Sequence, residues 1–174
     1  MEMIKNSDQN NVLGDFIKRR TPQRCKNKDL PVLSVTKERS VVFQSERFDS
    51  IVASVDKSNY IIVPRGFIIQ GIHIDEGNFG LQNLVNEGIV SPAYKIWEIT
   101  SREVIPELLE YYLRSEMAID YYRRHYLGTT VARRQTITSD DLLAMPLNLP
   151  SYGKQQQFYN FMCQTDKSKY RCVT

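Results

Sequence analysis

Paired acidic residues are the first candidates for chemistry in this sequence. They occur twice, as Asp75-Glu76 and Asp140-Asp141. A nuclease of the PD-(D/E)xK type needs a carboxylate two residues before a lysine, so that both groups act on one metal ion and its bound water. No Asp or Glu of the chain has a lysine at that spacing. We therefore expect Asp75-Glu76 to be solvated in a loop and Asp140-Asp141 to cap a helical turn.

A second candidate for chemistry is the tetrapeptide Ser91-Pro92-Ala93-Tyr94. It is a weak match to the Asp/Asn-Pro-Pro-Tyr turn with which DNA adenine methyltransferases grip a flipped base. The second proline is absent, and the tetrapeptide lies in an apolar stretch that predicts a strand. No two of the eight glycines are separated by one residue, so the chain has no Gly-x-Gly loop for S-adenosylmethionine. We expect no catalytic residue and no cofactor, and we interpret the chain as a non-enzyme.

The sequence also offers no recognisable metal site. Its three cysteines, Cys25, Cys163 and Cys172, form no C-x-x-C pair, and its two histidines, His73 and His125, are far apart. We expect no bound zinc and reduced cysteines, as in a cytoplasmic protein. No apolar run approaches the roughly 18 residues of a membrane span, and the first residues lack the apolar core of a signal peptide.

Basic residues gather in two runs. Residues 18–28 read KRRTPQRCKNK and residues 123–134 read RRHYLGTTVARR, and neither run contains an acid. The formal net charge is only +3, from 23 Lys+Arg against 20 Asp+Glu. Two basic runs on an otherwise balanced surface are typical of a face that contacts phosphates, although each run alone would also fit a solvated loop. The small net charge argues against tight non-specific binding to DNA.

The second run leads into the most informative segment, residues 128–158. Adjacent Arg133 and Arg134 are followed by a Thr-x-x-Asp cap at Thr138, a helical turn over 142–145 and a proline-punctuated extended piece over 146–150. LPSYGKQ, ending at Gln155, then predicts the start of a helix. This order resembles the end of a target-recognition domain in the specificity subunits of type I restriction-modification enzymes. In that family an Arg-rich turn and an LP-x-x-x-x-Q connector lead into a long spacer helix.

Residues 60–97 support the same resemblance independently. They are similar to the family's central hairpin and to the GIVSPAY strand that follows it, here residues 88–94. LGDF at 13–16 and PVLSVT at 31–36 match the family more loosely. The resemblance spans residues 12–161 and rests on the ordered set of segments.

The resemblance implies a division of labour. Such a chain would bind one half of a bipartite double-stranded DNA sequence, while a modification (methyltransferase) subunit and a restriction subunit supply the chemistry. The family's subunit resembles two recognition domains joined by two long helices. Here one recognition domain, residues 1–152, precedes a short helical stub, residues 153–174, which resembles a truncated spacer.

The stub leaves two interpretations open. Phe158, Phe161 and Met162 give it an apolar stripe. We expect this stripe to pack on its own domain, or else to bind the modification subunit or a second half-subunit. The alternative function is a truncated or decoy interaction protein that binds the modification subunit without recognising DNA.

On the family interpretation, loops of the domain read base edges and basic side chains fix the register on phosphates. The main DNA contact is expected in the loop that holds Arg133 and Arg134. The predicted contact residues are Thr129, Thr130, Arg133, Arg134, Arg19, Arg20, Arg24, Lys26, Arg65, Gln70 and His73. For Arg65 at a hairpin tip, and for Gln70 and His73, an exposed side chain without a DNA contact is an equally good expectation.

The elements that must position these residues are short. β-branched or apolar runs predict strands at residues 31–36, 40–44, 50–55, 60–63, 67–70 and 89–99. Apolar residues at helical spacing predict one long helix from 105 to about 126, which Gly128 ends, and a carboxy-terminal helix follows. With 174 residues, 41% of them apolar, we expect one α+β domain with a mixed or antiparallel sheet of short strands.

Overall fold

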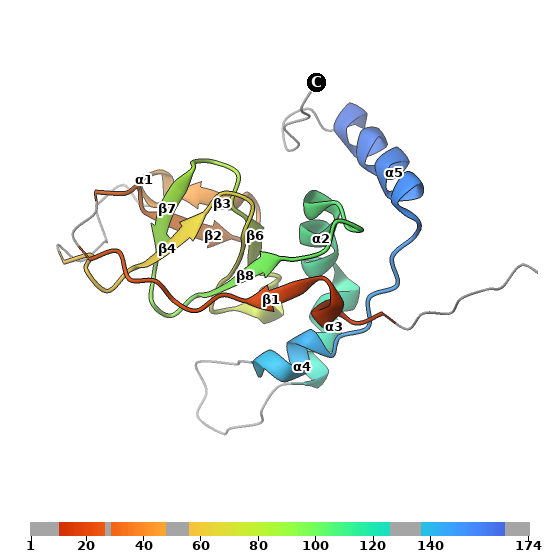
Figure 1. Cartoon of the computed structure of the whole chain (residues 1–174), viewed down its shortest axis with the longest axis horizontal. Coiled ribbons are helices and arrows are strands. Elements are labelled where there is room, and N and C mark those ends of the chain that lie inside the picture. The colour runs from red at the N-terminus through yellow and green to blue at the C-terminus, as the bar shows by residue number, and fades with distance from the viewer. Residues whose placement is uncertain (1–10, 27–28, 48–55, 126–136, 166–174) are drawn as a thin grey trace, which may run out of the picture.

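The computed structural model describes residues 11–26, 29–47, 56–125 and 137–165 (Figure 1). The α+β class is confirmed, because these ranges contain both strands and helices. The strands are β1 (Ile17–Arg19), β2 (Leu33–Thr36), β3 (Ser40–Phe43), β4 (Ile61–Pro64), β5 (Ile68–Gln70), β6 (Phe79–Leu81), β7 (Glu87–Val90) and β8 (Lys95–Ile99). The helices are η1 (Leu13–Asp15), α1 (Gln44–Arg47), η2 (Ile74–Glu76), α2 (Pro106–Leu113), α3 (Glu116–Arg124), α4 (Ser139–Leu143) and α5 (Tyr152–Thr165). The strand expected at 50–55 lies outside the described residues.

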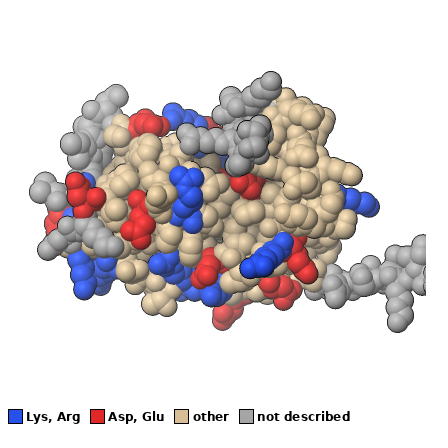
Figure 2. Space-filling model, turned by 45° about the horizontal axis from the view of Figure 1, so that its top comes forward, with Lys and Arg blue, Asp and Glu red and all other residues tan. Residues whose placement is uncertain are grey.

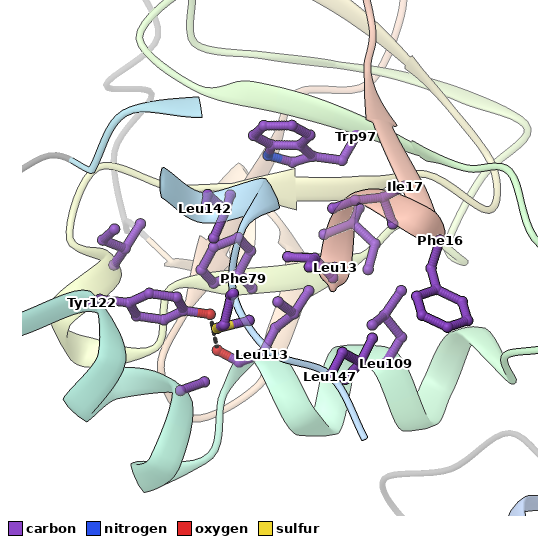
Figure 3. Packing of buried hydrophobic residues seen from close by; sticks show 14 of the residues in the cluster. Leu13, Phe16, Ile17, Phe79, Trp97, Leu109, Leu113, Tyr122, Leu142 and Leu147 are labelled. Atoms are coloured by element: carbon purple, nitrogen blue, oxygen red, sulfur yellow. Dashed lines mark hydrogen bonds between the residues drawn. The ribbon is translucent and has the colours of Figure 1, made fainter. Parts of the chain in front are cut away.

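A four-stranded antiparallel sheet, in the order β1-β8-β5-β6, lies at the centre of the fold. Successive side chains of a strand point to opposite faces, so the register assigns each residue to a face. Ile17, Ile68 and Trp97 share one face and join the core formed with α2, α3 and α4 (Figure 3). Ile69 and Ile96 share the other face and join a second core with the remaining strands. The inner strands β5 and β8 are therefore covered on both sides.

The second face is covered by two antiparallel pairs, β2–β3 and β4–β7. Gly80 of β6 allows β3 to approach closely, because a Cβ atom at this position would lie 2.6 Å from Cγ2 of Val41. The strands predicted at 31–36 and 40–44 are confirmed as the β2–β3 pair.

The single long helix expected over residues 105–126 is wrong, because two helices occupy its described part. Helix α2 ends before Arg114, and Ser115 begins α3 with extended backbone angles (φ −72°, ψ 155°). Ser115 Oγ accepts a hydrogen bond from the Ala118 N–H at 3.3 Å and donates to the Tyr112 carbonyl at 2.7 Å. Serine favours such caps over the helix interior, and the apolar spacing concealed this signal.

The break allows α3 to fold back against α2. The Tyr122 hydroxyl donates to the Leu113 carbonyl at 2.8 Å, and its ring centroid lies 5.5 Å from that of Phe79 (Figure 3). Tyr122 is fully buried, as is Leu142 of α4 in the same core. Helices α3 and α4, which precede and follow the segment with Arg133 and Arg134, are thus fixed to one core.

The strand expected over residues 89–99 is also divided. Its first residues belong to β7, which pairs with β4, whereas β8 pairs with β1 and β5. The two strands are joined by a turn in which Ser91 Oγ accepts from the Ala93 N–H at 3.3 Å and the Ser91 carbonyl accepts from the Tyr94 N–H at 3.0 Å. Pro92 has no N–H for a strand ladder, which explains why pairing stops here.

The hairpin expected around Pro64-Arg65-Gly66 is wrong as well. The turn itself is present, with Gly66 in the left-handed region (φ 82°), but β4 pairs with β7 while β5 pairs with β6 and β8. The Arg65 N–H donates to the Asn86 carbonyl at 2.8 Å. Arg65 therefore lies at the connection between two sheets and not at a hairpin tip.

Helix α5 is anchored to α2 by one buried amide. Gln155 Oε1 accepts from the Ile105 N–H at 3.1 Å, and Gln155 Nε2 donates to the carbonyls of Glu103 and Pro150 at 2.8 and 3.0 Å. Gln155 is the glutamine of the LP-x-x-x-x-Q connector, and only 1% of it is exposed. In the part of the chain that is described, no helix combines the length and apolarity that crossing a membrane would need.

The apolar stripe of α5 is divided between two environments. Met162 packs on Ile105 and Leu108, as expected for a helix that folds back on its own domain. Phe158 and Phe161 remain 46% and 60% exposed. The separation of the chain at residue 152 into a domain and a stub stays a prediction.

We predict that Ser115→Ala lowers the free energy of unfolding by about 1 kcal/mol, because the cap of α3 is lost. Urea unfolding followed by the fluorescence of Trp97, the one tryptophan of the chain, measures the change. Ser45→Ala, at an exposed position of α1, is the matched control and should change stability by less than about 0.5 kcal/mol. Equal stability of the two variants would contradict the capping role.

Candidate nucleic-acid interface

The end of the central sheet beside β1 brings together basic residues from distant parts of the chain. Arg19, the last residue of β1, lies opposite Trp97 of β8, and its side chain is exposed. Lys95, the first residue of β8, is two positions from Trp97 and therefore shares its face. Arg19 Nη1 also lies 3.4 Å from Ser139 Oγ, at the start of α4. This group of residues, Arg19, Lys95 and Ser139, is called the sheet-end cluster below.

Lys95 was not predicted as a site residue. Its Nζ donates to the Ile137 carbonyl at 3.2 Å, and the side chain is partly buried. Burial, with the nearby charge of Arg19, lowers the pKa of the Lys95 ammonium group below its ordinary value. A lone lysine in the apolar segment around Ile96 gives no charge run in the sequence, and only the strand register shows that it adjoins Arg19.

The predicted contact residues Thr129, Thr130, Arg133 and Arg134 lie outside the described residues. Ile137 and Thr138, which follow these residues in the chain, make specific contacts with the fold. Ile137 is buried in the core, and the predicted Thr138 cap is confirmed, with Oγ1 accepting from the Asp141 N–H at 3.0 Å. The chain therefore returns to the described fold beside the sheet-end cluster.

The other residues of the amino-terminal run extend away from this cluster. Arg20 lies 4.8 Å above the ring of Phe67, and its Nη2 lies 3.2 Å from Gln23 Oε1. Arg24 pairs through its backbone with Ile61 of β4, and the exposed Lys26 follows with a left-handed backbone (φ 55°). Figure 1 shows this segment running from β1 toward the start of β4, where Arg24 is bridged to Ile61. The run is thus extended along the fold and does not form one compact patch.

Arg65, His73 and Gln70 lie in three different environments. Arg65 is exposed, and its Nη2 lies 3.4 Å from the Leu84 carbonyl. His73 is also exposed, immediately before η2. Gln70 is 4% exposed on β5, where its Oε1 accepts from Trp97 Nε1 at 2.9 Å. Gln70 is a core residue, so we no longer assign it to the interface.

The two acidic pairs differ, because Asp141 has a structural role whereas no such role is visible for Asp75. Asp141 Oδ2 accepts from Thr138 Oγ1 at 2.6 Å, so its side chain supports the cap that Thr138 forms. Asp75 Oδ1 is buried without a hydrogen-bond partner in the structure. Within the described ranges, no three His, Cys, Asp or Glu side chains are grouped so that they could bind a metal ion.

The surface charge is mixed. On the face shown in Figure 2, acidic and basic side chains alternate and no large area carries a single sign. Some cations have acidic partners, as in the pair Lys18–Glu98, in which Nζ and Oε2 are 3.3 Å apart. Binding of a polyanion to this face would therefore depend on particular cations and not on a general positive field.

Compared with known proteins, the sequence matches no protein-family model and no curated protein. Two solved structures are similar in fold. One was described under "Structural basis underlying complex assembly and conformational transition of the type I R-M system" and has a TM-score of 0.56 and 13% identity. The other is the HsdS subunit from Thermoanaerobacter tengcongensis, with a TM-score of 0.52 and 14% identity.

Each similarity covers 90% of this chain, which spans 37% and 36% of the length of the two matched chains. The fold that the resemblance implied is confirmed, because the strands and helices match a portion of a type I specificity subunit.

We predict that Gln70→Leu lowers the free energy of unfolding by about 1–3 kcal/mol, because the Trp97 indole N–H loses its buried acceptor. DNA affinity, measured by fluorescence anisotropy at a temperature where the variant is folded, should stay unchanged. Gln157→Leu, at an exposed position of α5, is the matched control for stability. A selective loss of DNA binding without loss of stability would return Gln70 to the interface.

Proposed function

We propose that this chain is a DNA target-recognition domain of a type I restriction-modification specificity subunit. It binds one half of a bipartite target and guides the modification and restriction subunits, and it contributes no catalysis itself. The observation that carries this proposal is the fold similarity over 90% of the chain to structures of that system. The ordered sequence segments that resemble the family support it independently.

The sheet-end cluster supports the choice of the DNA-facing side. Arg19 belongs to the amino-terminal basic run, and Ser139 follows the second run by five residues. Their side chains are 3.4 Å apart, so the amino-terminal run lies beside the start of α4, which follows the second run along the chain. Phosphate contacts position a protein on a duplex, and nearby loops can then read base edges.

The exposed aromatic residues of α2 and α5 favour partner binding on a second side. Phe158 and Phe161 of α5 are joined by Tyr111 of α2, whose ring packs edge-on at 6.3 Å from that of Phe158 and is 53% exposed. We propose this surface for the modification subunit or a second half-subunit. It is also the feature that a decoy protein would share, so it does not separate the two functions.

Reconstitution with the modification subunit encoded beside this gene tests the proposal. Co-purification together with methylation of DNA at defined sites is expected, whereas the chain with S-adenosylmethionine alone should transfer no methyl group. A decoy would co-purify and direct no methylation. Failure to bind the modification subunit, or methylation by the chain alone, would contradict the proposed function.

We predict that the double variant R133A/R134A loses specificity while R19A/R20A loses affinity. An arginine that binds guanine through two hydrogen bonds contributes about 1–3 kcal/mol on the cognate half-site and less elsewhere. A phosphate contact affects all sequences about equally. Binding of the assembled methyltransferase to cognate and scrambled DNA measures both effects.

Each double variant controls for the other, because both remove two positive charges. Equal losses on both DNAs for R133A/R134A would limit that loop to phosphate contacts. Unchanged binding for both variants would mean that the DNA-facing side is wrongly assigned.

A further inference from the structure

We infer that Arg19 and Lys95 together form a binding site for one backbone phosphate of duplex DNA, with Ser139 beside it. The inference rests on the proposed function and names one phosphate contact within it. Lys95 is new in this role, because neither basic run includes it.

The strand register places the two cations on one surface. Arg19 is opposite Trp97, so Lys95 is its diagonal neighbour across the β1–β8 pair, and such neighbours are typically about 7–8 Å apart. Two long basic side chains at this distance can converge on a single phosphate group. Ser139 approaches the same place from α4, since its Oγ lies 3.4 Å from Arg19 Nη1.

The charges of this pair are uncompensated within the described residues. Lys18 has Glu98 as an acidic partner, and Arg114 has Glu110, at 3.3 and 3.2 Å. Arg19 and Lys95 instead contact neutral oxygens, those of Ser139 and Ile137. Two adjacent cations without a carboxylate destabilise each other, and the lowered pKa of Lys95 has this repulsion as its second cause after burial. An anion between them would remove the repulsion.

The donors that a phosphate requires remain available. A lysine ammonium group has three N–H donors and an arginine guanidinium has five, and the described contacts use one of each. The Ser139 hydroxyl accepts from Arg19, so its own proton can be donated to a phosphate oxygen. Arginine, lysine and serine are all frequent ligands of DNA phosphates.

A backbone phosphate of DNA fits better than an isolated anion. Beyond Arg19 the amino-terminal run also holds the exposed Arg24 and Lys26, whereas Arg20 packs over Phe67 on the side of the second core. Further exposed cations near the site suit a polyanion such as DNA, whereas a single anion would use only Arg19 and Lys95.

The test compares Lys95→Met, Lys95→Arg, Arg19→Met and the control Lys18→Met for binding to a mixed-sequence duplex over a range of salt concentrations. Lys18 is on the same strand as Arg19, points to the opposite face and is paired with Glu98. Removing one phosphate contact should reduce the slope of log affinity against log salt by about 0.9, which is roughly tenfold in affinity near 50 mM salt.

K95M and R19M should each show this reduction, and K95R should behave like the wild type. The losses of R19M and K95M should not add in the double variant, because both residues hold the same phosphate.

Trp97 fluorescence shows which variants are folded, and the exposed Arg19 provides the test if K95M is unstable. Wild-type binding with an unchanged slope in K95M and R19M would overturn the site alone, as would an equal loss in K18M. Absence of DNA binding by the wild type at every salt concentration would contradict the proposed function as well.

Discussion

The burial of both faces of the inner strands β5 and β8 is the constraint on which the rest of the structure depends. A polar group on such strands has to find a partner inside the protein or lie at the end of a strand. Inside the core the Trp97 indole N–H finds its acceptor in Gln70 Oε1. Lys95 lies at the start of β8, where its ammonium group reaches the Ile137 carbonyl. The central sheet can therefore present positive charge at that end, next to the exposed strand β1.

The same rule explains the connector before α5. The LP-x-x-x-x-Q pattern is recognisable in the sequence, but the role of its glutamine depends on backbone groups about 50 residues earlier. Gln155 satisfies the N–H of Ile105 at the start of α2 and the carbonyl of Glu103. Helix starts leave N–H groups without partners, and a buried start requires such a side chain. The glutamine of the motif thus joins the start of α5 to the segment that begins α2.

Local signals in the sequence predicted local structure well. The β-branched runs gave the β2–β3 pair, and the Thr138 cap and the carboxy-terminal helix are present. The errors have one physical origin, since apolar periodicity shows which residues are buried but not which partner buries them. The periodicity therefore predicted one strand in place of β7 and β8 and one helix in place of α2 and α3. Pro92 and Ser115 separate these elements in the structure.

The candidate site shows the same division between local and non-local information. Charge runs identified Arg19, which the structure places in the sheet-end cluster, whereas Gln70, predicted outside these runs, is a core residue. Lys95 could not be found from charge runs, because only the pairing of β1 with β8 shows that it lies near Arg19. Strand pairing is decided by contacts far apart in sequence, so a single isolated lysine becomes informative only after the sheet is known.

The modest net charge is consistent with a recognition domain that works within an assembly. Non-specific affinity for DNA increases with the number of phosphates neutralised, and this surface alternates acids with bases. A domain that binds half a target with few phosphate contacts would dissociate readily from random DNA. Affinity would then be recovered when a second recognition domain binds on the same duplex, because the second contact is intramolecular. On the proposed function, weak binding by the single domain is what makes the complete target necessary.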